Sequence, residues 1–211
     1  MCNILQVRWT LTPKTSPQPW IACSGCRSPK LFRSSGKIRL NANGKRLDAW
    51  LVYKCIDCDK TWNRTLFERQ TVHGLAPSTL EALQRSDPDW VRAREFDLDG
   101  LRRIVKRIEE PPDIVTRKEA VRAAGDWTVL EIEIVAEFPV NARLDRLLAS
   151  ELAISRSRLQ AFRGGGRLKA HPARNDFLRC RPKDGIKIIF DLTDVADAQA
   201  IGEAAANPER E

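Results

Sequence analysis

The chain has 211 residues, of which 42% are hydrophobic and 30% are charged, a balance that excludes a disordered polypeptide and favours one or two small globular domains. No window approaches the roughly 20 apolar residues that a membrane-spanning helix needs, so we expect a soluble protein without a membrane partner. The formal net charge of +8 favours a polyanion or an acidic protein as the partner.

The charge alternates along the chain in four blocks. Residues 1–70 carry a net charge of +9 and residues 138–190 carry +8, whereas residues 71–137 carry −4 and residues 191–211 carry −5. Clustered Lys and Arg side chains gain affinity for phosphates because binding releases condensed counterions. The two basic blocks are therefore candidate surfaces for polyanions, with solvated charge spread around each domain as the alternative.

Two C-x2-C turns form the strongest motif of the first block. Cys23 and Cys26 lie in C-S-G-C, and Cys55 and Cys58 lie in C-I-D-C. Each turn can place two thiolates on one side of a tight loop, and two such turns complete the tetrahedral shell that Zn²⁺ prefers. The pattern predicts a structural zinc site with no open coordination position, in a zinc-ribbon domain that spans residues 1–70.

Disulfides, free thiols and chance pairing are the alternatives for these cysteines. Disulfides need an oxidising compartment, but residues 1–9 lack the continuous apolar core of a secretory signal, so we expect a cytoplasmic protein that binds zinc. Cys2 and Cys180 stand apart from both turns and are expected to be ordinary thiols. His73 and His171 are isolated as well, and neither is expected to be a ligand.

The 28 residues between the two turns predict a β-hairpin. Residues 37–40 and 47–53 alternate between apolar and polar side chains, and Asn43-Gly44 can form a two-residue type I′ turn between them. Such a hairpin brings the second cysteine turn beside the first.

The flanks of the hairpin are less regular. Residues 61–72 favour either a third strand or the entry into a helix, and residues 1–19 favour an irregular strand and loop. Trp9 and Trp20 are expected to pack on the ribbon.

Residues 71–137 are expected to form an acidic helical connector followed by a strand. Three short helices are indicated by a capping box at residues 78–81, by the Asp87-Pro88 pair, and by the helical spacing of apolar residues 101–108. A second capping box, Thr116 with Glu119, predicts a fourth helix that ends near Gly125.

Strand patterns follow these helices. From Trp127 the apolar residues alternate with polar ones, which predicts a strand with one buried face. This strand can pair with residues 186–190. Residues 191–211 are expected to be an acidic tail, with little reason for order from Ala205 onward.

Residues 138–190 contain the second group of motifs. R-L-D-R-L-L-A from Arg143 predicts a helix, S-R-S-R from Ser155 predicts a second helix capped by that serine, and three glycines from Gly164 end it. D-G-I-K-I from Asp184 predicts a turn into an apolar strand. This order of motifs resembles the S4 RNA-binding domain, over about a quarter of the chain.

In that family two short helices and a small sheet form a basic surface that grips structured RNA. The resemblance implies that the RNA-binding positions are Arg143, Ser155, Arg156, Arg158 and Arg163, with Arg167 and Lys169 just beyond them. Guanidinium groups on rigid helices can bind phosphates through two bonds each, and a helix N-terminus adds backbone donors. The alternative is a helical hairpin with a solvated arginine face.

One segment departs from the S4 pattern. The usual glycine-led strand and Asn-Gly turn is replaced by G-R-L-K-A-H-P over residues 166–172. Pro172 is expected to interrupt a paired strand.

A second resemblance concerns the chain as a whole, and its most distinctive stretch is residues 34–63, which begin with S-S-G-K-I-R-L-N-A-N-G-K-R-L-D-A-W. The chain resembles a family of uncharacterised bacterial proteins known only as a domain of unknown function. The resemblance implies a bacterial, cytoplasmic setting and implies no activity.

Together the motifs predict an α+β protein that binds structured RNA, ribosomal RNA included, without catalysis. The alternative is a protein-interaction or regulatory adaptor in which Trp50 and Trp62 are exposed anchors, although small zinc domains more often bury such side chains. An enzyme is not expected, because four thiolates leave a metal no open position and neither histidine has a recognisable partner. No small-molecule substrate is expected either.

Overall fold

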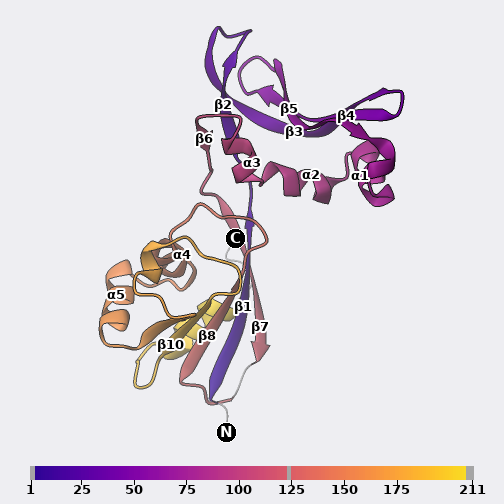
Figure 1. Ribbon diagram of the computed structural model, residues 1–211. Coiled ribbons are helices and arrows are strands. Elements are labelled where there is room, and N and C mark those ends of the chain that lie inside the picture. Colours follow the sequence, from indigo (N-terminus) through magenta and orange to yellow (C-terminus); the bar gives the residue numbers. More distant parts are fainter. Residues whose placement is uncertain (1–2, 123–124, 208–211) are drawn as a thin grey trace. The chain divides into compact units, whose positions relative to one another are not determined.

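The computed structural model describes residues 3–122 and 125–207, which divide into two compact units (Figure 1). One, the cysteine unit, spans Thr15–Pro111; the other, the split unit, joins the residues up to Lys14 with those from Pro112 onward. The protein is of mixed α+β class, with two five-stranded sheets and six α-helices among the described residues. In the same residues no helix combines the length and the apolar character needed to cross a membrane.

The cysteine unit is an antiparallel sheet with three helices. Its elements are β2 (Gln18–Cys23), β3 (Ser28–Asn43), β4 (Arg46–Cys55), β5 (Thr61–Thr71), the 3-10 turn η1 (Val72–Gly74), α1 (Pro77–Arg85), α2 (Pro88–Glu95), α3 (Leu98–Arg102) and β6 (Ile108–Glu109). The strand order is β5-β4-β3-β2-β6.

Strands β3 and β4 confirm the predicted hairpin, and β5 is the third strand beside them. The two-residue turn is Gly44-Lys45, one position later than expected, because Asn43 pairs with Arg46. Gly44 has a φ of +60°, a left-handed conformation that glycine adopts without strain.

The helices cover one face of this sheet (Figure 1). Leu51 and Tyr53 of β4 are fully buried on that face and pack with Val91 of α2. The Arg64 side chain of β5 is only 3% exposed and donates to the carbonyl and carboxylate oxygens of Asp97, at 3.1 and 3.0 Å. This ion pair, with a buried arginine and a half-exposed carboxylate, ties the sheet to the loop before α3.

The predicted helices form in part. Asp87 caps α2 by accepting the Trp90 N–H at 2.9 Å, as expected. Helix α1 starts at Pro77, so Ser78 lies inside the helix instead of capping it. Helix α3 ends at Arg102, well short of the prolines at 111–112, because residues 108–109 pair with β2 as strand β6.

The split unit is a sheet flanked by three helices. Its elements are β1 (Ile4–Pro13), β7 (Ile114–Arg122), β8 (Val129–Val135), α4 (Leu144–Glu151), α5 (Arg156–Gly164), β9 (Leu168–His171), the 3-10 turn η2 (Phe177–Arg179), β10 (Lys187–Asp191) and α6 (Ala198–Ala206). The strand order is β7-β1-β8-β10-β9, in which only β1 and β8 are parallel. The pairing of β8 with β10 confirms the expected contact between the two C-terminal strands.

Strand β1 gives the largest difference from the expected domains. Residues 1–70 do not form one domain, because β1 lies between β7 and β8 in the split unit. The alternate residues from Leu5 to Leu11 are buried in the core of that unit. Trp9 is among them, so it does not pack on the cysteine hairpin as expected. Apolar residues that alternate over this length predict a strand whose apolar side belongs to the buried face of a sheet.

Strand β7 replaces the expected fourth helix. Over residues 114–122 the chain pairs antiparallel with β1, and this ladder prevails over the capping box at Thr116 and Glu119. The connector expected over residues 71–137 is therefore divided: its helices and β6 belong to the cysteine unit, and β7 and β8 belong to the split unit.

The C-terminal segment also differs from expectation. Helix α6 packs on the core through Ile201, Gly202 and Ala205, so the described part of the acidic tail is ordered structure. Residues 208–211 of that tail lie outside the described residues. Strand β9 ends at His171, so Pro172 follows the paired strand and does not interrupt it.

Candidate metal centre and basic surface

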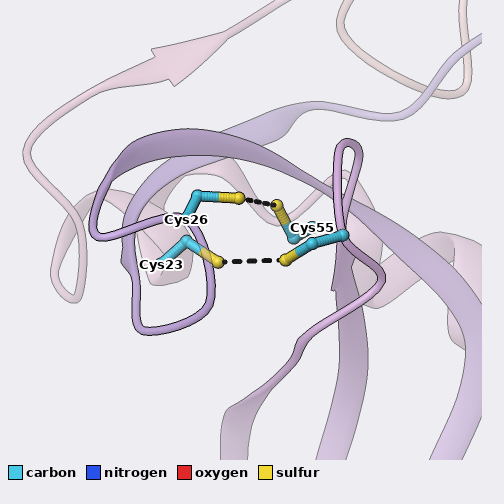
Figure 2. Close-up of side chains that lie close together, drawn as sticks. Cys23, Cys26 and Cys55 are labelled. Atoms are coloured by element: carbon cyan, nitrogen blue, oxygen red, sulfur yellow. Dashed lines mark hydrogen bonds between the residues drawn. The ribbon is translucent and has the colours of Figure 1, made fainter.

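Four cysteines meet at one edge of the cysteine unit's sheet (Figure 2). Strands β2 and β4 run in the same direction on either side of β3, so Cys23 and Cys55, which end them, lie at the same edge. Cys26 and Cys58 lie in the turns that follow. The four Sγ atoms are within 4.8 Å of one another. Cys23 Sγ is 3.4 Å from Cys58 Sγ, and Cys26 Sγ is 3.9 Å from Cys55 Sγ.

The two turns share one backbone geometry. The Arg27 N–H donates to the Cys23 carbonyl at 2.8 Å, and the Asp59 N–H donates to the Cys55 carbonyl at 3.1 Å. Arg27 and Asp59 both have left-handed φ angles, +55° and +57°, which are uncommon for residues other than glycine. Two different tetrapeptides thus adopt the same loop, which directs both sulfurs of each turn toward the other turn.

Close approach of the turns depends on a small residue and an ion pair. A Cβ atom on Gly25 would lie 3.0 Å from Cys58 Sγ, tighter than ordinary contacts, so glycine lets the first turn reach the second. Lys30 of β3 forms a salt bridge with Asp57 of the second turn at 2.5 Å, and this carboxylate raises the pKa of Lys30.

Electrostatics in the cluster favour a bound cation. A hydrogen bond with the backbone at Cys26 lowers the pKa of Cys23 to about 7, whereas sharing a hydrogen bond with the Cys58 thiol raises the pKa of Cys26 to about 12. The cluster therefore favours one thiolate, and the ionisation of that sulfur disfavours ionisation of Cys26. A divalent metal ion removes this conflict because it stabilises every thiolate that coordinates it.

The donor set fits a tetrahedral metal ion. Metal–sulfur bonds of about 2.3 Å place tetrahedral sulfurs about 3.8 Å apart. The observed separations of 3.4 and 3.9 Å lie on either side of that value, and both exceed a disulfide bond of about 2.05 Å. The predicted ligand set is therefore brought together and can hold a metal ion. Cys180, His73 and His171 are not in the cluster, and Cys2 lies outside the described residues.

Most of the residues expected to bind RNA lie on and around α4 and α5, and two of them share one acid. Arg143 and Arg156 donate to the carboxylate of Asp145, with Nη2–Oδ2 distances of 2.7 and 2.8 Å. Ser155 caps α5 as predicted, its Oγ accepting the Arg158 N–H at 3.1 Å.

Asp145 is a positioning residue for the two arginines. Burial raises the pKa of this carboxyl, but hydrogen bonds from Arg156 and Arg143 outweigh burial and hold the pKa below its usual value. Asp145 is 1% exposed, whereas the arginine side chains are 40% and 51% exposed. A buried charge thus holds two half-exposed guanidinium groups in fixed orientation. The arginines stand out in the sequence, but the role of this acid is visible only in the contacts.

The other predicted arginines form ion pairs elsewhere in the split unit. The pairs are Arg158 with Asp197, Arg163 with Asp176, and Arg167 with Asp191. Arg158 engages both carboxylate oxygens of Asp197, which precedes α6. Lys169 is exposed on β9, one of the two edge strands of the sheet. The structure therefore does not gather all seven predicted residues at one point.

A groove beside Arg143 adds a basic residue that the motifs do not single out. The groove has a volume of about 560 Å³, and Arg146 and Arg181 contribute to its lining. Arg146 is exposed and lies three residues after Arg143, so both face the same side at this end of α4. That spacing is the sequence signal that identifies it.

These features define an α+β protein of two units with a four-cysteine candidate metal centre in one of them. The chain belongs to the family described as "Protein of unknown function (DUF1062)", which matches residues 40–174. This confirms the expected resemblance of the chain to a family known only as a domain of unknown function. No curated protein and no solved structure matches the chain.

Proposed function

We propose that this protein is a non-enzymatic RNA-binding protein that grips structured RNA through α4 and α5, with a structural zinc ion in the cysteine unit. In this proposal the α4–α5 hairpin with β9 and β10 is an S4-like RNA-binding module, and β2 to β5 with the two cysteine turns are a zinc ribbon. The observation that carries the RNA proposal is the pair of guanidinium groups, from the starts of α4 and α5, that Asp145 holds.

The arginine pair has the chemistry of a phosphate clamp. Each guanidinium is planar and can bind two phosphate oxygens at once. Arg143 and Arg156 are already fixed by Asp145, so binding costs less side-chain entropy than it does for free arginines. The backbone N–H groups at the start of α5 that Ser155 does not cap carry a partial positive charge. They add to the attraction that the guanidinium groups exert on an anion. A surface of this kind reads the spacing of phosphates and so favours the shape of folded RNA.

Zinc is the metal that suits four thiolates best. Sulfur-only donors exclude the hard cations Mg²⁺ and Ca²⁺ as natural occupants. Four protein ligands leave no position for water or substrate, which makes the ion structural. The core around it is small, built on Phe32, Leu51, Tyr53 and Val91 with Cys23 and Cys55, so metal binding supplies stability that apolar burial alone does not.

Fluorescence anisotropy with a labelled RNA hairpin tests the arginine surface. Arg156→Ala and Arg146→Ala should each weaken binding about tenfold, the loss of one charge-assisted contact. Each should also reduce the slope of log K against log salt by about one. Arg156→Ala leaves Arg143 to neutralise Asp145, so the fold persists.

Arg85→Ala is the matched control for this experiment. Arg85 lies on α1 of the cysteine unit, its side chain is 77% exposed, and its removal changes the net charge equally. The affinity for the RNA hairpin should be nearly unchanged in this variant. Equal loss in all three variants, or no loss in any of them, overturns the assignment of the surface.

A further inference from the structure

The face of the cysteine unit's sheet opposite the helices, here the Trp50 face, is made by alternate residues of three strands. Paired residues in adjacent antiparallel strands point to the same side. The members of this face are Arg33, Lys37, Arg39, Asn41 and Asn43 of β3, Arg46, Asp48, Trp50, Val52 and Lys54 of β4, and Thr61, Asn63, Thr65 and Thr71 of β5.

The charge on this face is one-sided. It carries five Lys or Arg side chains and one acid, Asp48, which already accepts the Arg69 N–H at 2.6 Å. The basic side chains are exposed. The remaining members are mostly short amides and hydroxyls, so the surface is shallow, basic and rich in hydrogen-bonding groups.

Trp50 stands at the centre of this face. Its Cα partners are Arg39 on β3 and Thr65 on β5. Its neighbours Ala49 and Leu51 point to the other side and are fully buried, whereas Trp50 is half-buried. The core therefore does not account for this side chain.

Trp62 shows the contrast between the two faces. It pairs with Tyr53 on the buried face, with ring centroids 5.4 Å apart, and packs against the core around the cysteines. The sequence allows both tryptophans to be either buried core residues or exposed anchors. Trp62 packs in the core, whereas Trp50 faces away from the helices.

We propose that the Trp50 face binds single-stranded RNA, with one base stacked on the Trp50 indole and the backbone phosphates on Lys37, Arg39 and Lys54. Base-on-aromatic stacking combined with a basic sheet is how sequence-tolerant single-strand binding is achieved. A duplex hides the faces of its bases, so a stacking platform selects an unpaired strand. An acidic protein that uses Trp50 as an anchor is the competing occupant, and the test below distinguishes it from RNA.

This site lies in a different unit from the arginine surface and shares no residue with it. The inference therefore goes beyond RNA gripping by α4 and α5. It adds a second binding site, and the two are tested with different probes.

Titration of the zinc-loaded full chain with a short fluorescent oligouridine tests the proposal. Trp50→Ala should weaken oligouridine binding at least about fivefold, the effect of losing one stacked base. Trp50→Phe keeps an aromatic face and should retain most of the affinity. Arg39→Ala with Lys54→Ala should reduce the slope of log K against log salt by about 1.4, since each phosphate contact to a single strand contributes about 0.7.

Two controls separate stacking from charge and from misfolding. Arg85→Ala, on the helix side of the same unit, should leave oligouridine binding nearly unchanged. Oligouridine should also quench tryptophan emission of the wild type more than that of Trp50→Phe, a readout from variants with an intact sheet. If Trp50→Ala loses zinc or helical signal, the quenching and the salt slope decide the question.

The opposite results overturn the proposal. Oligouridine affinity that is the same in wild type, Trp50→Ala and Arg39→Ala/Lys54→Ala excludes this face as the site. Equal binding of oligouridine, duplex DNA and polyglutamate, without dependence on Trp50, shows charge attraction or an acidic protein site instead. Binding of the RNA hairpin through Arg156 is tested independently, because it does not involve Trp50.

Discussion

Removal of the two arginines around Asp145 should destabilise the protein more than removal of Asp145 itself. Arg143→Ala with Arg156→Ala removes both partners of a carboxylate that is 1% exposed in the intact protein. Stripping a buried charge of its partner costs about 3–5 kcal/mol. Asp145→Ala leaves two guanidinium groups that are 40% and 51% exposed and can turn to water, so its cost is about 1–2 kcal/mol.

Urea unfolding of the zinc-loaded protein at pH 7 measures this difference. The double arginine variant should unfold at lower urea than Asp145→Ala. Adding Asp145→Asn to the double variant should restore part of the lost stability, because a neutral amide is less costly to bury than a charge. A double variant as stable as Asp145→Ala, or a triple variant with no recovery, would refute the reasoning that Asp145 is a buried charge held by both arginines.

Three further predictions concern the packing, the metal and the pH response. Gly202→Ala should lower the free energy of unfolding by about 1–3 kcal/mol, because the new methyl meets the Trp127 ring at 2.2 Å. Gly164→Ala, which has nothing within 4 Å of the new methyl, should be neutral or slightly stabilising, and similar urea midpoints for the two variants would contradict this. Chelation of zinc should abolish hydrogen-exchange protection in the cysteine unit and spare the split unit, and equal loss in both would count against a local structural metal. The hydrogen bond from Arg158 lowers the pKa of Asp197, so this pair stabilises the fold above the usual carboxyl pKa of 3.8 and its contribution is lost as pH falls below that value. The stability of Asp197→Asn should therefore fall less steeply with acid than that of the wild type, and an identical profile would exclude the pair as a contributor.

Local motifs in the sequence predict local structure well. The two cysteine turns, the hairpin between them and the Asp87 cap each depend on residues only a few positions apart, and each forms. Their energetics are set mainly by hydrogen bonds within one turn or one ladder, and no distant segment competes for those groups in the fold.

The domain boundaries depend on contacts that cross most of the chain. Leu5 pairs with Leu130 in the parallel ladder between β1 and β8. Its alternating pattern predicts a strand, but nothing nearby in the sequence specifies which sheet accepts it. Thr116 shows the same limit: its capping box favours a helix locally, and the ladder with β1 overrides that preference.

The two candidate sites differ in the same way. The cysteine ligands follow from spacing alone, because each turn fixes two sulfurs. The arginine surface depends on which acid each arginine meets. Arg158 meets Asp197, 39 positions further along, and only Arg143 and Arg156 share Asp145. Motif order identifies the basic helices but not the two residues that the fold presents together.

The most direct test of the proposed function is a salt series of hairpin RNA binding by the zinc-loaded wild type and the Arg156→Ala variant, with duplex DNA as the comparison ligand. We predict tighter binding of the hairpin than of the duplex, a steep salt dependence, and in the variant an affinity about tenfold lower with a slope reduced by about one. Equally weak binding of both nucleic acids, lost at modest salt and unchanged by the substitution, would contradict RNA recognition and favour a protein-interaction adaptor.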